Sequence, residues 1–214
     1  MISWAIRGFA QELEGLLPEP VRTVQISDYL GEIIKNADTM RKIIDSLRAY
    51  TRKTIEHVEQ VDVNSVIDEA LSLLSRQLDS RGIEFSRDFA RDLPKVVANA
   101  VQLEQVIINL VSNSREAIAE TGRGHGRITI GTRPAGKLVE IRVSDDGIGM
   151  NEGTRAKIFN PFFSTRDAGK GMGLGLSISY GIIGLPHGSI MVESELGKCT
   201  EFTIRIPQDF RELG

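Results

Sequence analysis

The sequence predicts an α+β protein in which a helical hairpin is followed by an α/β sandwich, with a mixed sheet covered by helices on one face. Residues 1–56 contain little glycine and carry apolar side chains at helical spacings. Residues 61–207 instead alternate strand-like and helix-like patterns. Most of the predicted strands follow one another through short turns, which favours pairing between neighbours in one sheet.

The composition is that of an ordinary globular protein. Of 214 residues, 41% are hydrophobic and 26% are charged, and the net charge of −3 gives no general attraction to nucleic acid. The single cysteine, Cys199, cannot form an internal disulfide, which fits a reducing cytoplasm. No apolar run approaches the length of a membrane span. We therefore expect a cytoplasmic chain that reaches a membrane only through parts absent from it.

Two amphipathic helices are predicted for residues 1–56. The first ends at the proline pair of 17–20, and Ser27 or Asp28 can cap the second. The second helix has an apolar seam with a spacing of three or four residues, formed by Tyr29, Ile33, Ala37, Met40, Ile44 and Leu47. Because a lone hairpin leaves this seam exposed, we expect a homodimer with a four-helix bundle. The alternative is that the seam packs on the following domain of the same chain.

The α/β region begins with a short strand and a helix over 61–78, for which Asn64 is a possible cap. A strand over 82–89 and a helix over 99–120 follow. This second helix has one broad apolar face, formed by Leu103, Val106, Ile107, Leu110, Ala117 and Ile118. The remaining elements are a helix from about Leu174 and two strand pairs, at 127–133 with 138–146 and at 189–195 with 200–207.

A long glycine-rich loop over 147–173 interrupts this pattern. Loops of this length in a compact domain are usually functional. Its second end, GKGMGLGL (169–176), opens a helix, where free backbone N–H groups favour phosphate. The absence of side chains at Gly171, Gly173 and Gly175 lets an anion reach that backbone. The spacing matches neither a Walker A loop nor a dinucleotide fingerprint, so a merely flexible loop is the alternative.

Three polar residues strengthen the case for a ligand site. Asp145 ends a strand, and a carboxylate in an apolar cleft can accept a hydrogen bond from an exocyclic amine such as that of adenine. Asn109 and Asn113 lie four residues apart and therefore share a helix face. Amide oxygens are acceptable ligands for Mg²⁺. The alternatives are a turn carboxylate at Asp145 and a capping or buried amide network for the asparagines.

Five segments in order resemble the N, G1, F, G2 and G3 boxes of the histidine kinase ATPase domain. They are NLVSNSREA, DDGIGM, IFNPFFSTR, GKGMGLGLSI and HGSIMVESELGKCTEF. That domain belongs to the superfamily of gyrase, heat-shock protein 90 and MutL. The preceding hairpin resembles the dimerisation and phosphotransfer domain of two-component sensor kinases. The resemblance divides the chain into a hairpin over 1–56, a catalytic domain over 61–207 and a tail over 208–214.

The resemblance implies a site for ATP and Mg²⁺, and a response-regulator receiver domain as partner. Asn113 would hold the Mg²⁺ that bridges the phosphates, and Asn109 would support the phosphate side, so these two are the expected catalytic residues. Asp145 would recognise the adenine amino group, with Gly147 and Gly149 giving the base room. Further nucleotide contacts are implied for Arg166, Gly171, Gly173, Leu174, Gly175, Leu176 and Thr200. Phe159, Phe162 and Phe163 would anchor the lid.

The sequence departs from the family in two places near the last box. Cys199 stands where G-x-G-T has its second glycine, and Ser189 replaces the last glycine of HGG. Both changes lie at the sheet edge, so we expect ATP binding to survive. Arg166 keeps the charge of the usual lysine but not its geometry.

The histidines are the largest departure, because the family phosphorylates one early in its first helix. The chain contains only His57, His125 and His187, none of them on that helix. We expect the acceptor before Met1 of a truncated hairpin; a protein that lacks the acceptor is the alternative. Two functions follow: a histidine kinase core that by itself cannot autophosphorylate, or a nucleotide-binding regulatory or scaffold module. Gyrase-like ATP hydrolysis is disfavoured, because those relatives place a glutamate where Asn109 stands.

Overall fold

The computed structural model describes residues 30–31, 33–34, 58–79, 82–166, 173–184 and 187–209. The chain divides into two compact units, Met1–Arg52 and Lys53–Gly214. Apart from four helical residues, the predicted hairpin lies outside the described residues. The hairpin and the proposed domain limits therefore remain predictions.

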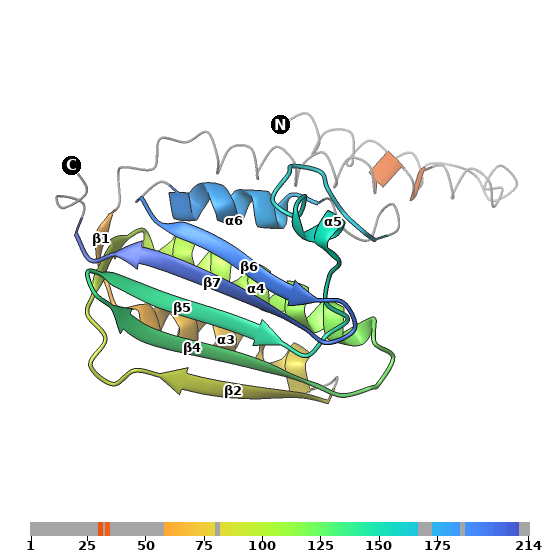
Figure 1. The fold of residues 1–214 in the computed structure, drawn as a ribbon, viewed down its shortest axis with the longest axis horizontal. Coiled ribbons are helices and arrows are strands. Elements are labelled where there is room, and N and C mark those ends of the chain that lie inside the picture. The colour runs from red at the N-terminus through yellow and green to blue at the C-terminus, as the bar shows by residue number, and fades with distance from the viewer. Residues whose placement is uncertain are drawn as a thin grey trace, which may run out of the picture. The chain divides into compact units, whose positions relative to one another are not determined.

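A five-stranded mixed sheet forms the centre of the second unit (Figure 1). Its strands are, in spatial order, β2 (Ile83–Phe89), β4 (Gly126–Ala135), β5 (Leu138–Asp145), β7 (Cys199–Pro207) and β6 (Ser189–Glu195). Strands β2 and β4 are parallel, and every other neighbouring pair in this sheet is antiparallel. The mixed sheet predicted from the sequence is confirmed.

Three helices cover one face of this sheet: α3 (Val63–Asp79), α4 (Ala100–Ala119) and α6 (Gly175–Gly184). Figure 1 shows α3 and α4 behind the strands. Alternate strand residues such as Ile130, Ile141 and Ile204 are fully buried, and they belong to the same core as Ile107 and Leu110 of α4. The apolar face expected on the second helix is thus the face that packs on the sheet.

Smaller elements complete the unit. A separate two-stranded sheet pairs β1 (Glu59–Val61) with β3 (Val96–Ala98), and the short helix α5 (Glu152–Arg155) lies within the long loop. Asn99 caps α4, because its side chain accepts a hydrogen bond from the Gln102 N–H at 3.0 Å. In the part of the chain that the structure describes, no helix is long and apolar enough to span a membrane.

The prediction that Asn64 caps α3 is wrong. Asp62 takes this position and accepts from the Ser65 N–H at 3.2 Å. Asn64 lies inside the helix, where its side chain donates to the Ala90 carbonyl at 3.0 Å and accepts from the Thr132 hydroxyl at 2.8 Å. A tertiary partner on β4 therefore outcompetes the local cap.

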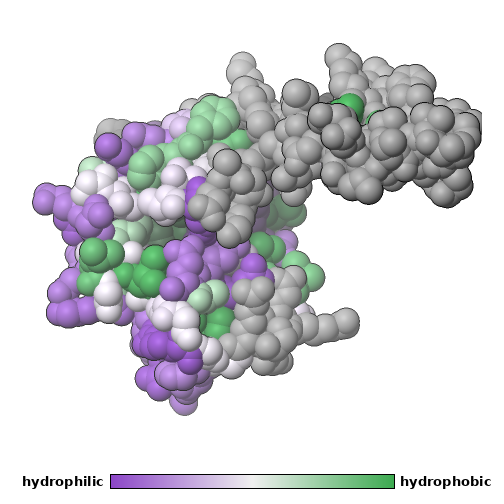
Figure 2. All heavy atoms as spheres, turned by 90° about the vertical axis from the view of Figure 1, so that its right-hand side faces the viewer, coloured by the Kyte–Doolittle hydropathy of each residue, from purple (hydrophilic) through white to green (hydrophobic). Residues whose placement is uncertain are grey.

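The other face of the sheet is free of described helices and carries a buried carboxylate. Glu140 on β5 is 1% exposed. It accepts hydrogen bonds from the Nε atoms of Arg142 at 2.8 Å and Arg205 at 3.0 Å, and it pairs with Arg133 at 2.5 Å. The arginine stems cover it while their charged ends stay in water. Figure 2 shows another side of the molecule, where hydrophobic residues of the described part appear as separate patches among hydrophilic ones.

Candidate functional site

The centre of the site is Asp145, the last residue of β5. Its side chain is on the helix-covered side, is 4% exposed, and accepts from the Gly147 N–H at 3.0 Å. Burial raises the pKa of Asp145, and the charge of Asp146 adds to this rise. The nearby Ser114 hydroxyl and the Gly147 amide oppose the rise, although Ser114 reaches no described group with normal hydrogen-bond geometry. A buried carboxylate with so few donors retains a strong capacity to accept further hydrogen bonds.

Thr200 lies directly beside Asp145. The two residues are cross-strand partners in the β5–β7 ladder, and Thr200 is also 4% exposed. Its hydroxyl contacts the Ser194 hydroxyl at 3.0 Å. The structure therefore brings together two side chains that the sequence separates by more than fifty residues.

The glycines that follow Asp145 pack closely against other parts of the protein. A Cβ atom at Gly147 would lie 2.7 Å from Ala117 of α4, and one at Gly149 would overlap the Glu195 carbonyl. Gly149 also has a φ of 63°, which side chains rarely adopt. These two glycines let the loop pack tightly against the protein itself. The expectation that their missing side chains give a base room remains a prediction.

Asn109 and Asn113 lie on one face of α4, as predicted, but their surroundings differ. The Asn109 amide donates to the Ser179 hydroxyl of α6 at 3.0 Å, and a Cβ atom at Gly175 would lie 2.9 Å from Asn109 Cγ. Asn109 thus holds α6 against α4. In contrast, Asn113 Nδ2 is buried and has no hydrogen-bond partner among the described residues. The Asn113 amide nitrogen can therefore still donate a hydrogen bond.

The glycine-rich segment before α6 is described from Gly173 onward, so the role expected for Gly171 remains a prediction. Gly173 has a φ of 64°, and its Cβ position is 2.6 Å from the Phe162 carbonyl carbon. Leu174 is buried, and its carbonyl accepts from the Ile178 N–H and the Ser177 hydroxyl. Leu176 lies in the first turn of α6, where backbone N–H groups lack intrahelical partners.

Two residues of the phenylalanine segment behave differently. Phe159 stacks at a tilt on Tyr180 of α6, with ring centroids 5.2 Å apart, as expected of an anchor. Phe162 is 61% exposed and has a φ of 65°, so most of its side chain is not packed against the described residues. Its backbone packs closely against Gly173.

Arg166 is held by α4. Its guanidinium forms ion pairs with Glu116 and, at 3.4 Å, with Glu120. These carboxylates lie one and two turns beyond Asn113, so Arg166 is close to the helix that carries the asparagines. Sequence reasoning missed both glutamates, although their i, i+4 spacing placed them on one helix face. It also missed Ser114 and Ser194, for which a single sequence gives no distinguishing signal.

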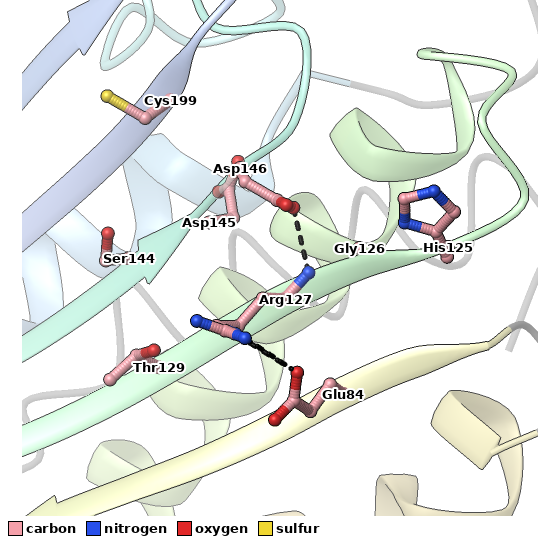
Figure 3. Close-up of a pocket in the computed structure, with 9 residues that line it drawn as sticks. All are labelled: Glu84, His125, Gly126, Arg127, Thr129, Ser144, Asp145, Asp146 and Cys199. Carbon is pink, nitrogen blue, oxygen red and sulfur yellow. Dashed lines mark hydrogen bonds and ion pairs between the residues drawn. The ribbon is translucent and has the colours of Figure 1, made fainter.

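The hollow drawn in Figure 3 borders this arrangement, because Asp145 is one of the residues that line it. It has a volume of about 500 Å³ and lies over the ends of β2, β4, β5 and β7 on the helix-free side. There the Arg127 side chain pairs with Glu84 at 3.0 Å, and the Arg127 N–H donates to Asp146 at 2.8 Å (Figure 3). Among the described residues, no three His, Cys, Asp or Glu side chains come together as a metal site.

Comparison with known proteins agrees with this geometry. The family described as "Histidine kinase-, DNA gyrase B-, and HSP90-like ATPase" matches residues 98–209. Sensor kinase CckA of Brucella abortus (strain 2308) is 37% identical over 195 residues, 84% of this chain and 20% of that protein. Sensory histidine kinase/phosphatase NtrB of Vibrio alginolyticus is 34% identical over 215 residues, 94% of this chain and 57% of that protein. The chain thus spans only part of these relatives.

Solved structures show the same fold. The catalytic domain of histidine kinase ThkA superposes with a TM-score of 0.63 at 30% identity, over 71% of this chain and 96% of that one. ThkA in complex with response regulator protein TrrA gives a TM-score of 0.68 at 27% identity, over 97% of this chain and 58% of that one. Since the family match covers more than half of the sequence, the chain belongs to the histidine kinase-, DNA gyrase B-, and HSP90-like ATPases, and its ATPase domain is of the sensor histidine kinase type.

Proposed function

We propose that this chain is the cytoplasmic catalytic core of a two-component sensor histidine kinase. It binds MgATP and transfers the γ-phosphoryl group to a histidine on a helical hairpin, from which the group passes to an aspartate of a response regulator. The observation that carries this proposal is the pair of buried acceptors, Asp145 and Thr200, beside a helix whose Asn113 has an unpaired buried amide. A bound nucleotide would supply a donor to Asp145 at one end of the site and an acceptor to the Asn113 amide at the other.

Asp145 and Thr200 form the end of the site that recognises the base. A carboxylate acceptor suits the amino group of adenine, whereas guanine presents a carbonyl oxygen in the same place. Repulsion between two acceptors in a buried site is costly, since neither is compensated by water. The site therefore selects ATP over GTP.

Asn113 and the start of α6 form the end that takes the phosphates. Gly173, Leu174, Gly175 and Leu176 bring free N–H groups to this end, and such groups bind phosphate oxygens. Bound Mg²⁺ would neutralise charge on the phosphates. One amide oxygen is too small a ligand set for this ion, so Asn113 would hold it only together with phosphate oxygens and water. Asn109 has its donor committed to Ser179 and acts by positioning α6.

Two partners complete the proposal. The hairpin over 1–56 joins two copies through the seam from Tyr29 to Leu47. A response-regulator receiver domain accepts the phosphoryl group, as the solved complex of ThkA with TrrA suggests by its printed name. The second candidate function, a nucleotide-binding regulatory module, is favoured by one observation: residues 1–56, which include the predicted first helix, contain no histidine.

Titration calorimetry of the chain with MgATP and MgGTP tests the nucleotide site. We expect ATP to bind in preference to GTP, and Asp145→Asn to reduce that preference by about tenfold or more, because the acceptor becomes partly a donor. Glu84→Gln is the matched control, since its exposed carboxylate pairs with Arg127 on the helix-free side of the sheet. Equal affinities of the unmodified chain for the two nucleotides would contradict the role of Asp145.

A further inference from the structure

Ser194, near the end of β6, makes three hydrogen bonds with a single hydroxyl. It accepts from the Met150 N–H at 2.8 Å and donates to the Cys199 carbonyl at 2.8 Å. Its third partner is the Thr200 hydroxyl at 3.0 Å. Ser194 and Thr200 are also cross-strand partners, so backbone pairing fixes their separation. One side chain thus joins the loop after Asp145, the first residue of β7 and the second buried acceptor.

The directions of these bonds follow from counting protons. A hydroxyl has one proton and two lone pairs. The Cys199 carbonyl can only accept, so the Ser194 proton goes there. The contact between Ser194 and Thr200 must then use the Thr200 proton, with Ser194 accepting. Thr200 is left with lone pairs alone for any other partner.

We propose that Ser194 is a positioning residue that fixes Thr200 as an acceptor toward the base of the nucleotide. This inference rests on the proposed function, because it concerns the same nucleotide site. With Thr200 held in this way, Asp145 and Thr200 both present lone pairs side by side, and the two N–H bonds of the adenine amino group can donate to both. Without Ser194, the Thr200 hydroxyl can rotate and donate to the carbonyl oxygen of guanine.

The surrounding backbone supports a role in alignment. The Gly197 N–H donates to the Ile148 carbonyl at 2.6 Å, and Gly149 packs against the Glu195 carbonyl with no room for a side chain. The β6–β7 turn therefore lies directly on the loop that follows Asp145. Ser194 connects the same two segments through Met150. Because the Gly197–Ile148 hydrogen bond still joins them when Ser194 is lost, we expect that loss to change the orientation of the Thr200 hydroxyl more than the sheet.

The test is the ratio of ATP to GTP affinity, measured by calorimetry on the full chain with Mg²⁺. We expect Ser194→Ala to lower this ratio by about tenfold, through weaker ATP binding, stronger GTP binding or both. Ser194→Thr keeps the hydroxyl and is expected to keep the ratio. Ser189→Ala, at the exposed start of the same strand, is the matched control and is expected to change nothing.

A double-mutant cycle separates positioning from simple stabilisation. Thr200→Val removes the acceptor itself, so adding Ser194→Ala to it is expected to leave the ratio unchanged. If Ser194→Ala does not fold, Ser194→Cys, with its weak donor, replaces it in the cycle.

The possible outcomes are distinct. An unmodified chain that binds neither nucleotide overturns the proposed function and this inference together. An ATP preference that survives Ser194→Ala, or equal losses of both nucleotides with the ratio unchanged, overturns this inference alone. Additive effects of the two substitutions also overturn it, because Ser194 would then act independently of Thr200.

Discussion

At the scale of single residues, Glu140 shows how a buried charge is retained on an otherwise open sheet face. Burial by itself raises the pKa of Glu140, but hydrogen bonds from Arg142 and Arg205 and the charge of Arg133 outweigh it. The pKa therefore lies below its ordinary value. The carboxylate is charged at neutral pH, and three arginines from β4, β5 and β7 are held together by it.

We predict that Glu140→Gln destabilises the protein by about 1–3 kcal/mol, because three guanidinium groups lose the carboxylate that they share. The lower part of this range is expected, since the arginines are half exposed. A lowered pKa in the folded state means that this stability is present above the ordinary glutamate pKa. It is lost as pH falls toward the lower folded value, because the unfolded chain takes up the proton first.

Urea unfolding between pH 3 and pH 7 checks this prediction. Glu84→Gln is the matched control, because Glu84 also pairs with an arginine on this face but is 66% exposed. We expect it to cost less than about 1 kcal/mol. Parallel pH profiles for Glu140→Gln and the unmodified chain would contradict the proposed origin of the effect.

At the scale of elements, the sequence predicted what depends on periodicity and local turns. The predicted helix at 99–120 and the four strands around 127–146 and 189–207 correspond to α4, β4, β5, β6 and β7, because alternation and helical spacing report directly on burial. Strand β3 was missed, since its three residues form a strand only by pairing with distant β1. The position of Asp145 at a strand end was predictable because the alternating apolar pattern of this strand ends there.

The site was predicted less completely than the fold. Its boxes were found by resemblance, but the partners of the glycines depend on tertiary contacts that no local pattern reports. Gly149 illustrates this: its conformation is set by the carbonyl of Glu195, which is distant in sequence. Asn64 failed as a cap for a similar reason, because Thr132 of β4 competes for its side chain.

Two glycines of α6 provide a direct test of this packing. A Cβ atom at Gly175 would overlap the Asn109 amide, whereas Gly184 faces open space without a positive φ. We predict that Gly175→Ala destabilises the protein by about 1–3 kcal/mol and weakens MgATP binding, because α6 must move away from α4. Gly184→Ala is expected to be neutral or stabilising by less than about 1 kcal/mol. Urea unfolding and calorimetry measure both effects; equal stabilities of the two variants would argue against the contact.

At the scale of the whole molecule, the nucleotide site and the phosphoryl acceptor are separate questions. Transfer requires an acceptor in line with the γ-phosphate at close distance. The three histidines of the sequence are His57, His125 and His187. The last two are exposed, His125 beside the hollow on the helix-free side and His187 in the turn before β6. Neither lies beside Asn113 on α4, and His57 is outside the described residues.

We therefore predict that this chain binds MgATP but does not phosphorylate itself on histidine. The measurement is incubation with γ-labelled ATP and Mg²⁺, followed by acid and base treatment, since phosphohistidine is labile to acid. Adding an upstream segment that places a histidine on the first helix is expected to restore labelling, because the residues assigned to the nucleotide remain in place. Asn113→Ala in that longer chain is the control, expected to abolish the label.

Acid-labile label on the chain as given would show that one of its own histidines is an acceptor. Absence of label from the longer chain, with ATP binding intact, would instead favour the nucleotide-binding regulatory module.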